Sequence, residues 1–319
     1  MAIPRPSGRR RRMAGLAALA AVCWLALYCR TAYASESATS TYPPGFQDTM
    51  AGYLPPPGFY FQQNLEFYTG HASRSVSLGR VEADLHGTLP VQYSIFNGVT
   101  KNRLWGSYYA WAAIIPIVEP ELSGFLKTPI GDLGRSQTVA GLSEIEIIPM
   151  MLGWHNGRSN QKAWVVVYIP TGEFSTTNFL STSLNRWALE FDYAYTFLDP
   201  RTGYEFDVAP GYTINFENPE TNYLSGQEFH MDYAALKHWP NGLGVGAVGY
   251  AFVQTTPDSG SGAKLGAFEG RAFALGPILN YRATLGSVPV GLTAKYYSEF
   301  GVSNRFEGHS YWLNISAAF

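Results

Sequence analysis

Charged residues are scarce in this sequence of 319 amino acids, where they make up 14% of the chain, against about 25% in an ordinary soluble domain. A disordered chain would need high charge and few aromatic residues, whereas aromatic residues here reach 15%. Cysteine occurs only twice, as Cys23 and Cys29, which argues against a disulfide scaffold. Basic residues do not outnumber acidic ones, so we expect no nucleic-acid partner. After residue 34 no apolar run approaches the 20 or so residues of a membrane-spanning helix.

The first 34 residues have the pattern of a bacterial export signal. Four arginines at positions 9–12 precede an apolar stretch at positions 13–28, and Ala32-Tyr33-Ala34 fits an A-x-A cleavage site. We therefore predict a signal peptide over residues 1–34, with an uncleaved signal anchor as the alternative. Both cysteines and six arginines fall within it, so the remaining chain has 16 basic and 24 acidic residues, a net charge of −8. Because this net charge is negative, we do not expect binding of polyanions to be the main function.

Alternation of apolar and polar residues with a period of two dominates the rest of the chain and predicts β-strands. In the last nine residues, Tyr311, Leu313, Ile315, Ala317 and Phe319 share one face. An aromatic residue that ends the final strand resembles the assembly signal of outer-membrane barrels. We therefore expect Phe319 to engage the barrel-assembly machinery; a terminal strand of a soluble sandwich is the alternative.

Two central segments, residues 186–197 and 204–217, alternate over a length that exceeds the usual 5–6 residues of soluble strands. They suit tilted transmembrane strands that carry apolar side chains toward lipid and polar side chains toward a lumen. Because backbone groups in lipid must pair within the protein, such strands must close into a barrel.

We predict an all-β protein: a transmembrane antiparallel up-and-down β-barrel of about 12 strands over residues 59–319, placed in the bacterial outer membrane among its lipids. Short connections, among them Asn97-Gly98 and residues 199–203, alternate with longer ones at residues 70–87, 118–139 and 171–183. Outer-membrane barrels have short periplasmic turns and long extracellular loops. The predicted strands begin near Phe59, Thr88, Leu104, Ala140, Gln161, Leu184, Gly203, Gly226, Gly242, Leu265, Val288 and Glu307.

Residues 35–58 precede the first predicted strand and are rich in proline and glycine. Proline lacks the donor that a strand ladder needs, so we predict an extended N-terminal arm or a plug. A disordered leader is the alternative.

The inward face of the predicted strands collects charged side chains. In a purely structural interpretation, these side chains hydrogen-bond to one another and support the barrel wall. In a functional interpretation, they form a polar constriction that selects solutes, since rings of acids favour cations. The lumen-lining candidates are Glu144, Glu146, Arg186, Glu190, Asp192, Glu205, Asp207, Glu228, His230, Asp232, Arg282 and Lys295.

Catalytic motifs are missing from the sequence. Neither G-x-S-x-G nor H-E-x-x-H occurs, and the six histidines show no metal-binding spacing. His230 and Asp232, two residues apart on one strand face, are the single pair that could serve an outer-membrane lipid-modifying enzyme. We therefore predict no enzyme, no cofactor and no metal site.

An ordered set of short strings resembles the outer-membrane family named for the MetA pathway of phenol degradation, which includes SphA-type transporters. The set spans residues 57–319 and includes YIPTGEF at 168–174, NFEN at 215–218, SGQEFH at 225–230 and GP at 276–277. The resemblance implies a barrel that admits hydrophobic or aromatic compounds, and it supplies no catalytic or binding residue.

These observations together predict an outer-membrane channel for passive uptake of small hydrophobic, aromatic or lipid-like compounds. Loops 118–139 and 171–183 would control access to it. A lipid-modifying enzyme and a sealed structural barrel are the alternatives.

Overall fold

A computed structural model describes residues 39–77, 80–128, 131–178, 180–264 and 266–319. The chain divides into two compact units, Met1–Thr31 and Ala32–Phe319, and all the described residues belong to the second. The predicted signal peptide, residues 1–34, lies outside the described part. Across the described residues, no helix has the length and apolar character needed to cross a membrane.

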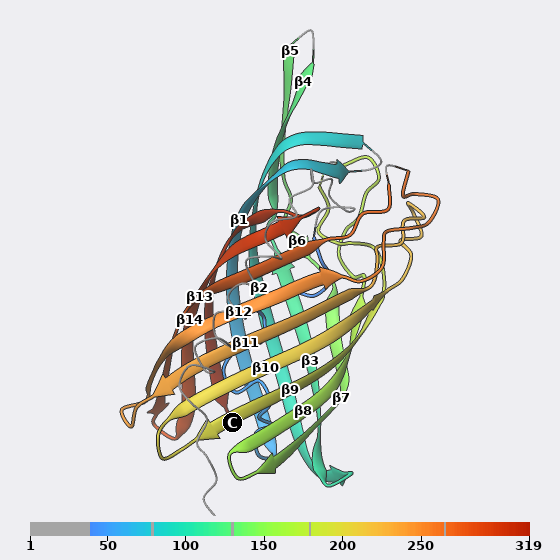
Figure 1. The fold of residues 1–319 in the computed structure, drawn as a ribbon. Helices are drawn as coiled ribbons and strands as arrows, with labels where there is room; N and C mark the ends of the chain where they lie inside the picture. Colours follow the sequence, from blue (N-terminus) through green and yellow to red (C-terminus); the bar gives the residue numbers. More distant parts are fainter. Residues whose placement is uncertain (1–38, 78–79, 129–130, 179, 265) are drawn as a thin grey trace, which may run out of the picture. The chain divides into compact units, whose positions relative to one another are not determined.

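The described residues form one antiparallel sheet that closes on itself (Figure 1). Twelve strands make the closed wall, because β15 pairs with β1 and β2 pairs with β3. The predicted fold class and number of wall strands are therefore confirmed. The wall strands are β1 (Gly58–Ser77), β2 (Arg80–Leu104), β3 (Ser107–Val118), β7 (Ile145–Asn156), β8 (Ser159–Ile169), β9 (Ala188–Asp199), β10 (Tyr204–Asn215), β11 (Glu228–His238), β12 (Leu243–Gln254), β13 (Arg271–Leu285), β14 (Val288–Ser303) and β15 (Glu307–Ala318).

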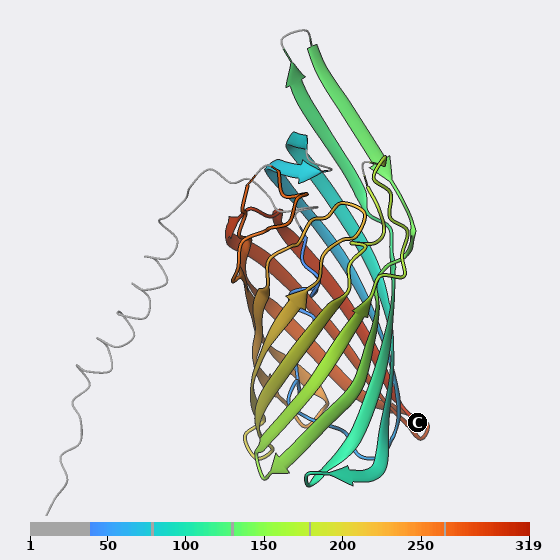
Figure 2. The same cartoon turned by 90° about the vertical axis from the view of Figure 1, so that its right-hand side faces the viewer.

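Three further strands belong to the connection between β3 and β7. Strands β4 (Glu121–Thr128) and β5 (Gly131–Thr138) pair with each other as a hairpin that rises above the wall, and β6 (Gly141–Leu142) pairs with the end of β3 (Figure 2). The loop predicted over residues 118–139 is therefore wrong for most of its length, since it contains this hairpin.

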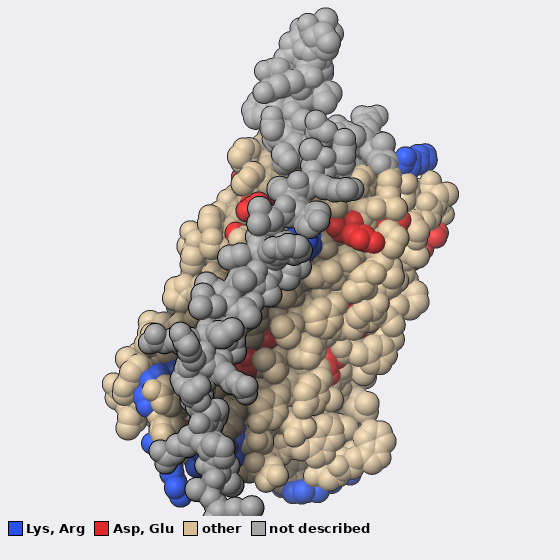
Figure 3. All heavy atoms as spheres, viewed as in Figure 1, with Lys and Arg blue, Asp and Glu red and all other residues tan. Residues whose placement is uncertain are grey.

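The period-two pattern separates the two faces of each wall strand. On β9, Glu190 and Asp192 are buried, whereas Phe191 and Tyr193 are exposed on the outer surface. The visible outer face carries few charged atoms over its middle, and lysine and arginine gather at the end with the short turns (Figure 3). This surface suits lipid contact, where charge is costly and aromatic side chains can form girdles.

Strand β2 differs from its prediction at both ends. Asn97 and Gly98 are not a turn: they lie within β2 and pair with Tyr60 and Phe59, and the ring of Trp111 covers Gly98. The turn is instead made by Trp105 and Gly106, both with positive φ, at 49° and 82°. The loop predicted over residues 70–87 is also wrong, because β1 and β2 continue as a ladder through most of it.

The two ends of the barrel sequence meet at the short-turn end. The backbone of Phe319 exchanges hydrogen bonds with that of Phe59, and the Phe319 side chain is exposed. The segment before β1 turns from this point into the interior of the barrel.

Candidate functional site: the lumenal arm and the cavity beside it

Residues 39–57, called the arm below, run through the barrel interior from the long-loop end to the short-turn end (Figure 2). Near the long loops, Thr41 bonds Asn215 at the end of β10. Near the short turns, the carbonyl of Leu54 lies 2.9 Å from Nε2 of His155 on β7. Tyr42, Ala51 and Leu54 are buried between the arm and the wall.

Asp232 on β11 holds the upper half of the arm. Its carboxylate accepts hydrogen bonds from the Tyr42 hydroxyl at 2.5 Å, the Gly45 amide at 3.1 Å and the Gln47 amide at 2.9 Å. The arm belongs to no sheet, so its amides need partners from the wall. Hydrogen bonds to an ionised acceptor are the stronger kind, and Asp232 is therefore the main anchor of this segment.

Two acids of β10 hold the lower half of the arm in the same way. Glu205 accepts the Met50 amide at 2.7 Å, and Asp207 accepts the Ala51 amide at 3.2 Å. Asp207 also accepts the hydroxyl of Thr196, which itself accepts the Gly52 amide. These acids, predicted to line the lumen, thus accept hydrogen bonds from the backbone of the arm.

Tyr42 links the arm to β11 by ring packing as well as by hydrogen bonding. Its ring stacks on the imidazole of His230, with centroids 3.5 Å apart and planes 8° apart. The phenol hydroxyl donates a hydrogen bond to Asp232.

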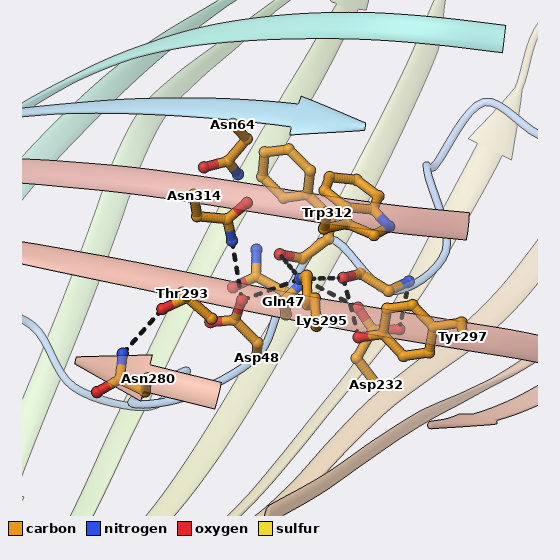
Figure 4. A network of polar contacts seen from close by, with 12 residues as sticks. Gln47, Asp48, Asn64, Asp232, Asn280, Thr293, Lys295, Tyr297, Trp312 and Asn314 are labelled. Carbon is orange, nitrogen blue, oxygen red and sulfur yellow. Dashed lines mark hydrogen bonds and ion pairs between the residues drawn. The ribbon is translucent and has the colours of Figure 1, made fainter. Parts of the chain in front are cut away.

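Lys295 on β14 is a buried cation that contacts the arm (Figure 4). Its Nζ lies 2.9 Å from the Asp48 carboxylate, donates to the Gly45 carbonyl at 2.5 Å, and sits 4.7 Å from the centre of the Trp312 ring. Asn314 on β15 donates to the same Asp48. One buried cation thus neutralises the arm's acid and satisfies a carbonyl that no strand can pair.

Gly45 is required by this geometry on two counts. Its φ of +85° is in the region that favours glycine, and a Cβ at this position would lie 2.8 Å from the Tyr297 ring. The arm can therefore pass closely between β11 and β14 only with glycine here.

A cavity of about 280 Å³ lies beside the upper arm, under the long loops. Its lining mixes apolar side chains, among them Leu89, Val118 and Leu184, with carboxylates. The carboxylates are Glu66, Glu121, Glu144, Glu146 and Glu299. Phe174, Ser175, Asn178 and residues 180–184 form part of the cavity wall, so the loop predicted to control access borders this cavity.

The predicted site residues separate into groups. Glu205, Asp207, Asp232 and Lys295 contact the arm as described above. Arg186 does so as well, through Thr41 at 3.1 Å. Arg282 also reaches the arm, at Thr49, but its side chain is 44% exposed and lies at the rim.

Glu144 and Glu146 border the cavity rather than the arm. Glu144 accepts hydrogen bonds from the Ser183 hydroxyl and the Leu184 amide, which fixes the loop that closes this side. Glu228 is buried on β11, with one oxygen lacking a hydrogen-bond partner among the described residues.

Glu190, Asp192 and His230 form a buried cluster of their own on β9 and β11. His230 and Asp232 do not form the pair that a hydrolase would need. His230 faces Glu190 and Asp192, while Asp232 directs both carboxylate oxygens at the arm.

Sequence reasoning missed several contributors to this region, among them Tyr42, Glu66, Glu299 and Arg305, which donates to Ser40 of the arm. Glu299 shares the parity of Lys295 on β14 and accepts the Tyr250 hydroxyl at 2.7 Å, so the alternation could have placed it. Tyr42 carries no such signal, because the arm has no periodic pattern.

The closed wall with polar groups inside and apolar groups outside defines the class of protein: this is the fold of an outer-membrane β-barrel channel. A solved outer membrane channel from Pseudomonas putida F1 is similar, with a TM-score of 0.65 at 12% identity over 87% of this chain and 100% of that one. The β domain of the Bordetella autotransporter BrkA is less similar, with a TM-score of 0.47 at 9% identity over 82% and 100% of the two chains.

Residues 46–315 match the family described as "Putative MetA-pathway of phenol degradation", and the chain belongs to this family. The resemblance inferred from the short strings is thereby confirmed. The sequence matches no curated protein at a significant level.

Proposed function

We propose that this protein is a bacterial outer-membrane channel through which small hydrophobic, aromatic or lipid-like compounds pass by diffusion. The observation that carries the proposal is the cavity under the long loops, which offers apolar side chains at the outer mouth of a closed barrel. Ligand sites are typically apolar concavities with a few placed polar groups. Twelve strands enclose less space than the 16 of an open aqueous porin, and the arm narrows that space further.

The surroundings of such a channel follow from its surface. The apolar outer face would contact outer-membrane lipid. The barrel-assembly machinery would recognise the last strand with Phe319. The family supports a substrate of aromatic character by its name alone, so the chemistry of the cavity is the stronger argument.

Uptake of a neutral aromatic fluorophore, N-phenyl-1-naphthylamine, tests the proposal in cells that carry the protein as their sole added channel. Val118 is buried against the cavity, and its neighbour Ile117 is exposed on the outer face. We expect Val118→Trp to fill the cavity and lower uptake to the level of cells without the protein. The matched control Ile117→Trp should leave uptake unchanged.

A sealed structural barrel is the second candidate, favoured by the arm that runs the length of the lumen. It predicts that uptake is the same with the wild type, with Val118→Trp and with no protein. That result would overturn the channel proposal.

A further inference from the structure

Three buried side chains meet on the lumenal face of β9, β10 and β11 in an arrangement that the channel does not use. Asp192, Gly211 and His230 stand directly opposite one another on these adjacent strands. Glu190 lies two residues before Asp192, on the same face. One ligand atom from each of Glu190, Asp192 and His230 falls within 4.8 Å of the other two.

The contacts that His230 makes in this cluster are longer than ordinary hydrogen bonds. Nε2 of His230 lies 3.4 Å from Oε2 of Glu190 and 3.7 Å from Oδ1 of Asp192, whereas N–H···O bonds measure about 2.7–3.2 Å. A water bridging two such atoms would hold them about 4.5 Å apart, from about 2.8 Å for each bond. Both ring nitrogens of His230 and Oδ2 of Asp192 accordingly have no hydrogen-bond partner among the described groups.

The same barrel contains a pair that shows the ordinary alternative. Nε2 of His238 lies 2.7 Å from Oε2 of Glu205, a direct hydrogen bond. His230 has two carboxylates within reach and bonds neither, although it and Glu190 are each only 1% exposed.

The separations in the cluster fit ligands around a metal ion. Zinc binds nitrogen and oxygen at about 2.0–2.2 Å, and the ligands of a tetrahedral ion are therefore about 3.3–3.6 Å apart. The distances from Nε2 of His230 to Glu190 and Asp192, 3.4 Å and 3.7 Å, are close to this ligand–ligand distance. One imidazole with two carboxylates is a donor set that suits divalent first-row metals.

Gly211 provides the space in which the two sides of the cluster meet. A Cβ on this residue would lie 2.3 Å from both Oδ1 of Asp192 and Nε2 of His230. The glycine therefore lets both side chains lean toward each other over the backbone of β10. Any larger residue would occupy the position between them.

The neighbours of the cluster hold its members in place. Glu190 accepts the hydroxyls of Thr213 at 2.5 Å and Tyr168 at 3.1 Å, and the ring of Tyr42 covers one face of His230. Such outer contacts are what orient ligands at metal sites. We propose that Glu190, Asp192 and His230 form a binding site for a divalent transition metal ion, which ties β9 to β11 beneath the arm.

Zinc binding by the full chain, extracted from outer membranes in mild detergent and stripped with EDTA, tests the proposal. After zinc addition and desalting, we expect about one zinc per chain by elemental analysis, and loss of it in His230→Gln. His238→Gln is the matched control, since its histidine is already hydrogen-bonded to Glu205, and it should retain zinc. Heat-modifiable gel migration confirms that each variant is folded.

Two further measurements keep the test independent of whether His230→Gln folds. Gly211→Ala preserves all three ligands but fills the space between them, and it should also lose zinc. Cobalt added to the stripped wild type should give the visible absorption bands of a tetrahedral complex. If the wild type retains no zinc and shows no cobalt spectrum, or if zinc persists equally in His230→Gln and Gly211→Ala, the site does not exist.

Discussion

Two groups of lumenal carboxylates look alike in sequence and differ in what they contact. Asp232, Glu205 and Asp207 accept hydrogen bonds from the backbone of the arm. Glu66, Glu144, Glu146 and Glu299 border the cavity above it. The first group holds a segment of the chain in place, and the second faces an internal cavity. Inward-facing acids in a barrel are therefore not in themselves a selectivity ring.

Removal of the arm should have the largest effect on this comparison. A chain that lacks residues 39–57 would keep all twelve wall strands and lose what occupies the lumen. We expect single-channel conductance in planar bilayers to rise by about tenfold or more, since barrels between 8 and 16 strands pass from filled to open. An unchanged conductance would mean that the arm does not limit the path.

Loss of an arm anchor should be more costly for stability than loss of a cavity acid. Asp232→Ala leaves the Tyr42 hydroxyl and two amides without their acceptor, and should lower the free energy of unfolding by about 2–4 kcal/mol. The control Glu146→Ala, in the cavity, should cost less than about 1 kcal/mol. Urea midpoints followed by heat-modifiable migration measure both, and equal losses would erase the distinction between the two groups.

Gly45 sharpens the same comparison on a smaller scale. Gly45→Ala should destabilise the barrel by about 1–2 kcal/mol for the left-handed backbone, with an added cost for moving the Tyr297 ring. Gly106 has nearly the same φ, +82°, and nothing within 4 Å of a Cβ. The loss of unfolding free energy in Gly45→Ala beyond that in Gly106→Ala therefore measures how tightly the arm is packed. Equal losses would mean that the arm moves aside without cost.

The smallest effect should come from replacing one cavity acid by its amide. Glu146→Gln replaces a carboxyl group that borders the cavity and removes no contact to the arm. Rings of acidic side chains around a pore favour cations, and this substitution changes only one such side chain, so we expect a decrease in cation preference of less than about twofold. Reversal potentials in a salt gradient measure it, and a larger change would assign selectivity to the cavity after all.

Much of the wall was predictable from the sequence because the constraint on it is strictly periodic. Lipid on one side and a lumen on the other require apolar and polar residues to alternate along each strand. Glu190, Phe191 and Asp192 could therefore be assigned to the inner or outer face from their positions in this alternation alone. The hairpin of β4 and β5 escaped prediction because it stands beyond the wall, where no such alternation is imposed. Asn97-Gly98 was wrongly predicted as a turn because its turn-forming residues are only a local signal. The pairing of β1 with β2 keeps both residues within a strand.

The site was less predictable, because it depends on contacts across strands and on a segment without periodicity. Nothing in the spacing of Glu190, Asp192 and His230 indicates that β10 places a glycine between them. Likewise, the proline- and glycine-rich composition of residues 35–58 indicated a segment outside the sheet but not its partners. Those partners include residues of seven different strands, β7, β9, β10, β11, β13, β14 and β15, so only the closed barrel brings them together.

The arm also has a bearing on the order of events during assembly. Apart from the Tyr60 hydroxyl, which donates to Pro56, the hydrogen-bond partners of the arm on the wall lie 101 to 266 residues further along the chain, from His155 to Asn314. Contacts between residues so distant in sequence form late. The arm therefore completes its hydrogen bonds only after β14 and β15 have joined the wall, so the first described residues of the chain are among the last to reach their final positions.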